Sequence, residues 1–248
     1  MSKVLGIACE DNGHFSAVTR LVDDTLVAAH DWLDGILESC RSWRGVAADE
    51  RWYKYDADDV NDLRPFVWEG RRIRQHGHIN GEPLKAGAGM WRRVLLLFCH
   101  SKPRPDVVVL VRDMDGYPGR LDGMSQVRDA LQWPFKVALA TPEPEVEAWR
   151  VAGFEAQNPA EANRLAELRK ELSFDPPTQS HRLTSHPNDA ATDAKRVLER
   201  LCEGHLNRED ACLADRDVLR QRGAHNGAAA FLDEIDQHIV PLFSPGGP

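Results

Sequence analysis

Short apolar runs alternate with amphipathic stretches along the first 157 residues of the chain. The run Val-Val-Val-Leu-Val at residues 107–111 is too short for a helix core and is mostly β-branched, so it predicts a strand buried on both faces. Residues 4–9 and 135–140 are similar runs, and a further short strand is predicted at 52–55. Strands separated by helical segments are typical of an α/β fold with a mostly parallel sheet and helices on both faces.

Helical periodicity predicts the elements between and after these strands. Before the last strand, apolar residues recur at helical spacings within residues 15–39, 90–99 and 127–133. The last third of the chain is predicted to be helical at residues 158–172, 190–202, 208–222 and 228–243. We therefore expect an α/β catalytic domain at 1–157, with an insertion at 41–90, and a helical region at 158–248 packed on the same domain.

Composition and charge narrow the class of protein. Hydrophobic residues make up 42% of the 248 residues and charged residues 28%, as in ordinary soluble globular proteins. No apolar run approaches the length of about 18 residues needed to cross a membrane, and the first residues lack the pattern of a secretory signal. We expect a cytoplasmic protein without membrane contact, and its five scattered cysteines are expected to be reduced thiols.

Two aspartates end the strand predicted at residues 107–111. Asp113 and Asp115 stand two positions apart, which in an extended chain sends both carboxylates to the same side. Gly116 then turns the chain away at the carboxyl edge of the sheet, where open α/β sheets place their ligands. Adjacent carboxylates repel unless a cation neutralises them, and oxygen ligands favour Mg²⁺ or Mn²⁺. The alternative is an ordinary pair of aspartates in a turn.

Other acids follow the neighbouring strands. Glu10 comes directly after the first strand, so it is expected at the same edge as the aspartates. Thr141 is expected to cap a helix after the last strand, and one or two of the following glutamates would favour that helix end through its dipole. The segment has three glutamates on alternate positions, Glu143, Glu145 and Glu147, which is more acidic residues than the helix end requires. Glu145 or Glu147 is therefore a candidate metal ligand. Lys195 is either a surface lysine or a cation that points back at these acids.

The formal net charge of −8 argues against general charge-driven binding of nucleic acid. One segment of the chain is nevertheless rich in basic residues. Trp68 and Trp91 are interleaved with these basic residues, and this combination suits phosphates and bases. A solvated loop explains the same composition. The basic residues of the segment are Arg64, Arg71, Arg72, Arg74, His76, His78 and Lys85.

The order of these acids resembles that of the TOPRIM family, and the Pro-Glu-Val-Glu-Ala-Trp step with a downstream lysine resembles its OLD-type nucleases. The resemblance implies that Glu10 acts as a general acid/base or ligand and that Asp113 and Asp115 hold Mg²⁺. It also implies a second metal at Glu145 and Glu147, with Lys195 stabilising the phosphate. The chain departs from the family where Asp11 and Asn12 separate Glu10 from Gly13, and where residues 41–90 form a long insertion.

Three functions are therefore open. The first is a metal-dependent nuclease that contacts nucleic acid through Arg71, Arg72, Arg74 and Lys85. The resemblance implies an ATPase partner, since the chain lacks a GxxxxGK[ST] loop, and self-association into a homo-oligomer is compatible with it. The second is a HAD-like phosphatase with Asp113 as its nucleophile, although that motif normally follows the first strand. The third is a non-catalytic subunit of an ATPase complex.

Overall fold

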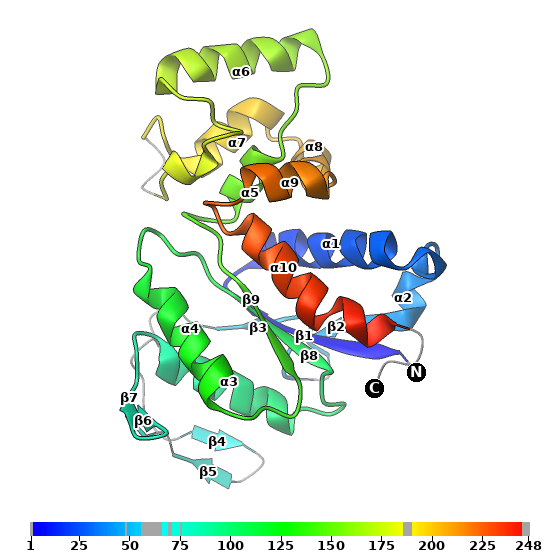
Figure 1. Ribbon diagram of the computed structural model, residues 1–248, viewed down its shortest axis with the longest axis vertical. Coiled ribbons are helices and arrows are strands. Elements are labelled where there is room, and N and C mark those ends of the chain that lie inside the picture. The colour runs from blue at the N-terminus through cyan, green and yellow to red at the C-terminus, as the bar shows by residue number, and fades with distance from the viewer. Residues whose placement is uncertain are drawn as a thin grey trace.

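A parallel sheet forms the centre of the molecule (Figure 1). The structure is a computed structural model that describes residues 2–47, 49–55, 66–68, 71–74, 76–185 and 190–244. The strand order is β2 (Arg41–Arg44), β1 (Lys3–Cys9), β8 (Val107–Val111) and β9 (Lys136–Ala140), with β3 (Tyr53–Lys54) paired to the end of β1. Every pairing in this sheet is parallel. The predicted α/β class and parallel sheet are confirmed.

Helices cover both faces of the sheet. On one face lie α1 (Asn12–Ala29) and α10 (Ala228–His238), and on the other lie α3 (Ala88–His100) and α4 (Gly119–Ala130) (Figure 1). Successive residues of β8 alternate between the two resulting hydrophobic cores, and all five are 0% exposed. This is why its sequence is a continuous apolar run rather than an alternating pattern.

The remaining helices lie beyond the carboxyl ends of the strands (Figure 1). Residues from α5, α6 and α7 build a third hydrophobic core there, with Phe154 and Leu168 at 1% and 0% exposed. None of the described helices is long and apolar enough to cross a membrane. The helices of this region are α5 (Glu147–Ala152), α6 (Pro159–Leu172), α7 (Ala194–Cys202), α8 (Leu206–Ala211) and α9 (Arg216–Arg222).

Short elements complete the described part of the chain. Two antiparallel hairpins, β4–β5 and β6–β7, lie at the bottom of the view in Figure 1, on the side of α3. The strands of the hairpins are β4 (Phe66–Trp68), β5 (Arg71–Ile73), β6 (His78–Ile79) and β7 (Glu82–Pro83). The short helices are η1 (Asp31–Leu33), α2 (Leu37–Cys40), η3 (Ser180–Arg182) and η4 (Val240–Phe243).

Several element boundaries differ from the predicted ones. The helix predicted at 15–39 ends at Ala29, and Gly35 then takes a left-handed φ of 71° that no α-helix accommodates. The helix predicted at 208–222 is two helices, because Asp215 accepts backbone N–H groups as the N-cap of α9. Of the helix expected at 127–133, only residues 127–130 are helical, as the end of α4, which begins at Gly119 and ends at Ala130. Strand β2 was not predicted, since its residues are mostly polar.

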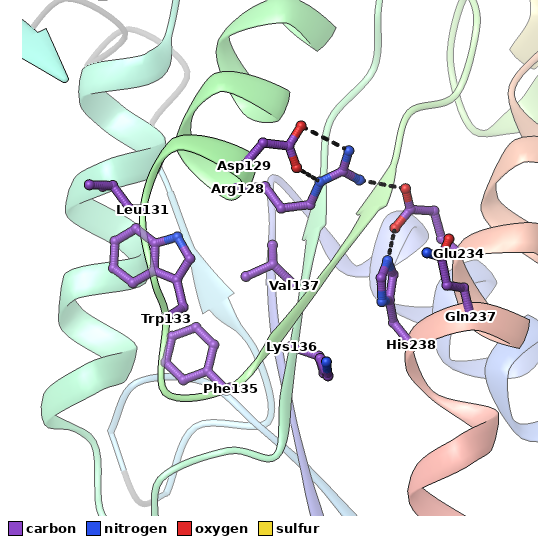
Figure 2. A pocket seen from close by; sticks show the side chains of 10 residues that line it. All are labelled: Arg128, Asp129, Leu131, Trp133, Phe135, Lys136, Val137, Glu234, Gln237 and His238. Atoms are coloured by element: carbon purple, nitrogen blue, oxygen red, sulfur yellow. Dashed lines mark hydrogen bonds and ion pairs between the residues drawn. The ribbon is translucent and has the colours of Figure 1, made fainter. Parts of the chain in front are cut away.

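The outer edge of β9 is covered by side chains from both helical layers (Figure 2). Glu234 of α10 accepts the backbone N–H of Leu139 at 3.3 Å and a hydrogen bond from Arg128 of α4 at 2.6 Å. His238 lies 3.5 Å from the same carboxylate. These contacts enclose one side of a pocket of about 330 Å³, which Trp133 and other residues line from the opposite side. The ion pair between Arg128 and Glu234 thus covers the outer edge of β9 and blocks the pairing of another strand there.

Candidate functional site

The order of the strands reverses between β1 and β8. The chain passes from β1 to β2 on one side of the sheet and later enters β8 on the other side. In open parallel sheets, ligands bind outside the carboxyl ends of the strands at such a reversal. Glu10 directly follows β1, and Asp113 follows β8 after one intervening residue. These two acids therefore flank the position where this fold class binds ligands.

Asp113 is buried and is held by contacts with two other elements. Its Oδ1 accepts the backbone N–H of Val146 at 3.1 Å and lies 2.9 Å from Nε2 of His14, which is 2% exposed. Nδ1 of His14 lies 2.9 Å from Oδ1 of Asp11, the N-cap of α1. Burial alone would lower the pKa of His14, but Asp11 and Asp113 outweigh burial and raise it to about 10. The imidazole is therefore a cation at neutral pH that balances both carboxylates.

Asp115 lies in the turn after β8 and pairs with an arginine. Its φ of 48° and that of Gly116 at 72° are both left-handed, and they reverse the chain sharply. The carboxylate of Asp115 pairs with Nη1 of Arg120, which also donates to the carbonyl oxygen of Asp113 at 2.8 Å. The N–H of Gly116 donates to Oε1 of Glu143 at 3.1 Å. This turn therefore brings the aspartates and the first glutamate of the next loop together.

Glu145 is the most deeply buried glutamate of that loop, with a side chain that is 5% exposed. Its Oε2 lies 3.3 Å from Nζ of Lys195, in the first turn of α7, and its Oε1 has no hydrogen-bond partner among the described residues. Burial and the charge of Glu147 raise the pKa of Glu145 to about 7, although Lys195 opposes this shift. Lys195 thus combines its two predicted positions, because its amino group lies at Glu145 while its side chain is largely exposed.

Glu10 approaches the site through a buried tyrosine. The hydroxyl of Tyr55 donates to the carbonyl oxygen of Val111 at 2.6 Å and lies 3.3 Å from Oε1 of Glu10. Burial raises the pKa of Tyr55 well above its ordinary value, and the charges of Glu10 and Asp113 add to this effect. The two acids that flank the strand reversal therefore act electrostatically on the same hydroxyl.

The loop between β9 and α5, residues 141–146, carries Glu143 and Glu145, and we call it the glutamate loop. Contacts from the C-terminal region hold this loop in place, and Thr141 does not cap a helix as predicted. Helix α5 begins only at Glu147 and has no side-chain cap. The carbonyl oxygen of Asn226 accepts the N–H of Glu143 at 2.9 Å and the indole N–H of Trp149 at 2.7 Å. Asn226 is 1% exposed. The loop conformation thus depends on a residue far away in the sequence, which local capping rules do not include.

The carboxylates of this edge, which we call the acidic edge, are Glu10, Asp11, Asp113, Asp115, Glu143, Glu145 and Glu147. Within the described residues, no three His, Cys, Asp or Glu side chains already have metal-binding geometry. The carboxylates instead face the cations His14, Arg120 and Lys195. The oxygen donors fit Mg²⁺ or Mn²⁺, and the unpartnered Oε1 of Glu145 is a buried acceptor that such an ion would satisfy.

The sequence did not identify His14, Tyr55 or Arg120 as members of this group. A usable signal exists for His14, because it stands three residues after the helix-capping Asp11, where the two side chains meet. No comparable local signal exists for Tyr55, which is brought in by the sheet from a weakly patterned region. Arg120 reaches Asp115 across a turn whose shape only the left-handed residues determine.

The β4–β5 hairpin of the basic segment lies apart from the acidic edge, whereas Lys85 lies near the beginning of α4. In Figure 1 the β4–β5 hairpin that carries Arg72 is at the bottom of the view, whereas α5 is in the upper part. Arg72 and Arg74 are exposed, and Lys85 lies 3.8 Å from Asp122. Trp91 is 0% exposed and packs edge-on against Tyr55, so it is not available to stack on a base. Arg64 and the side chains of Trp68 and Arg71 lie outside the described residues.

The pKa of Glu145 makes stability depend on pH. Its folded-state pKa of about 7 exceeds the ordinary 4.5, so the stability contributed by its proton is complete below 4.5 and is lost as pH rises through 7. Between about pH 5 and pH 8, the free energy of unfolding should therefore fall more for the wild type than for Glu145→Gln. Urea unfolding at a series of pH values measures this, with the exposed Glu199→Gln as control. Parallel curves for wild type and Glu145→Gln would contradict the prediction.

Comparisons of the chain with protein-family models, with curated proteins and with solved structures gave no match.

Proposed function

We propose that the protein is a divalent-metal-dependent hydrolase that cleaves phosphodiester bonds of nucleic acid at the acidic edge. The observation that carries this proposal is the buried carboxylate of Glu145, with one unpartnered oxygen, beside the buried Asp113. Burying carboxylates this close together is unfavourable without cations. His14, Arg120 and Lys195 balance part of this charge, but Oε1 of Glu145 still has no partner among the described residues, so a ligand that the cluster binds is the better explanation.

The residues that would hold the ion are Asp113, Asp115 and Glu145, with Glu10 and Glu147 as further ligands. Mg²⁺ or Mn²⁺ bound there would activate a water molecule and neutralise negative charge on the phosphate. The contact with Val146 fixes one oxygen of Asp113. It leaves the other oxygen of this carboxylate for a ligand.

The cations of the site have separate roles in this proposal. His14 is buried and orients Asp113 from within the protein. Lys195 is more exposed, with a side chain 57% accessible, and would move from Glu145 to a phosphate oxygen of the substrate. The ATPase partner, the homo-oligomer and the cytoplasmic location remain predictions from the sequence and its TOPRIM resemblance.

Thermal unfolding with increasing MnCl₂ tests the proposed metal site. A site present only in the folded state stabilises that state by mass action, by about 2.7 kcal/mol at 100 times Kd. We expect Mn²⁺ to raise the unfolding temperature of the wild type and to leave that of Asp115→Asn nearly unchanged. Asp34→Asn, at an exposed position beyond α1, should respond like the wild type. Absence of any Mn²⁺-dependent stabilisation in the wild type would refute the proposal.

A further inference from the structure

Two exposed hydrophobic side chains stand next to the acidic edge. Tyr117 is 65% exposed and Leu121 is 42% exposed, and they flank the beginning of α4 directly after the turn that carries Asp115. Most large hydrophobic side chains in the described residues are buried or half-buried. Of the two, Tyr117 is aromatic, and an exposed aromatic ring beside a polar site is available to stack on a ligand.

The turn presents the Tyr117 ring to solvent. Its backbone N–H donates to the carbonyl oxygen of Met114 at 2.8 Å, which fixes the residue immediately beyond the left-handed Gly116. The guanidinium of Arg120 lies 5.2 Å from the centre of the tyrosine ring and also pairs with Asp115. The ring is therefore connected through one arginine to a carboxylate of the acidic edge.

We infer that Tyr117 is a stacking platform for an unpaired base of the nucleic acid whose phosphate occupies the acidic edge. This inference rests on the proposed function and specifies its substrate. A base in a duplex is already stacked on its neighbours, so an exposed side chain can stack only on a base that is single-stranded or extruded. Stacking does not require a basic surface, which suits a chain with a net charge of −8.

Binding of labelled oligonucleotides tests the platform. Fluorescence anisotropy would compare a thymidine oligonucleotide with a duplex of equal length, at low salt and with Ca²⁺ to neutralise the carboxylates. We expect the wild type to prefer the single strand and Tyr117→Ala to bind it about tenfold more weakly, because stacking on one base contributes that order of affinity. Tyr117→Phe should retain the affinity, and duplex binding should not change in either variant.

Trp32→Ala is the matched control. Trp32 is 48% exposed and lies near the start of β1, at the opposite end of the sheet from the acidic edge. The inference fails if Tyr117→Ala binds the single strand like the wild type, if it weakens single-strand and duplex binding equally, or if the wild type binds neither. Cleavage of the same oligonucleotides with Mn²⁺ is measured separately. Single-strand preference without cleavage would refute the hydrolase proposal and leave the platform supported.

Discussion

Replacing Asp113 by asparagine is expected to abolish metal-dependent cleavage of nucleic acid while the protein stays folded. Asparagine has the same shape, and its amide oxygen can still accept the N–H of Val146. It removes a charged ligand of the proposed ion, and even residues that only orient ligands contribute about 10- to 100-fold to activity or affinity. We therefore expect a loss of more than about 100-fold in cleavage rate.

The stability of Asp113→Asn should change little. Burial raises the pKa of Asp113, so the ionised carboxylate is unfavourable in the folded protein, and neutralising it removes that cost. The variant also takes a partner from the buried His14, which acts in the opposite direction. We expect the unfolding temperature of the metal-free protein to shift by no more than about 2–4 °C, which corresponds to roughly 1 kcal/mol for a chain of this size.

Glu10→Gln separates the competing functions in the same assay. A nuclease that uses the whole acidic edge loses activity in both Asp113→Asn and Glu10→Gln. A phosphatase with Asp113 as its nucleophile would hydrolyse small phosphate esters, form an aspartyl phosphate and tolerate Glu10→Gln. A non-catalytic subunit would show neither activity in the wild type. Retained nucleic-acid cleavage in Asp113→Asn would contradict the proposed mechanism.

The central strands of the sheet were predictable because a short, continuous apolar run is typical of a strand that is buried on both faces. The run at 107–111 became β8 with the same boundaries, since alternate residues face two different hydrophobic cores. Arg41–Arg44 escaped prediction because an outer strand needs few apolar residues. Its place is set by pairing with β1. A strand such as β2, whose sequence has no pattern of apolar residues, thus forms because it pairs with an adjacent strand, and its own sequence does not predict it.

The acids of the site were predictable in position but their partners were not. Parallel strands bring their carboxyl ends to one edge, so Glu10 and Asp113 could be expected at the same edge because each follows a predicted strand. That these two strands are neighbours is seen only in the structure. The approach of Lys195 to Glu145 depends on how the helices beyond the sheet pack, which short motifs do not encode. The basic segment shows the converse, because its charges are close together in the sequence but the β4–β5 hairpin that carries Arg72 lies away from the acidic edge.

Gly227→Ala is expected to destabilise the protein strongly, because two independent constraints meet at this glycine. Its φ is 86°, and a Cβ atom there would lie 2.1 Å from the carbonyl oxygen of Thr141, at the start of the glutamate loop. Left-handed strain costs about 1–3 kcal/mol for a non-glycine residue, and displacing packed backbone adds about 1–3 kcal/mol.

Gly204→Ala is the control for Gly227→Ala. Gly204 has a φ of 69°, but a Cβ atom there would meet none of the described residues beyond its chain neighbours within 4 Å. The free energy of unfolding of Gly204→Ala should therefore fall only by the cost of the left-handed backbone conformation, about 1–2 kcal/mol, when both variants are compared by urea unfolding. Because the displaced backbone is that of Thr141, Gly227→Ala should also weaken stabilisation by Mn²⁺, whereas Gly204→Ala should not. Equal losses of stability in the two variants would show that the backbone at Thr141 moves at little energetic cost. Contact with Gly227 would then not hold the glutamate loop in position.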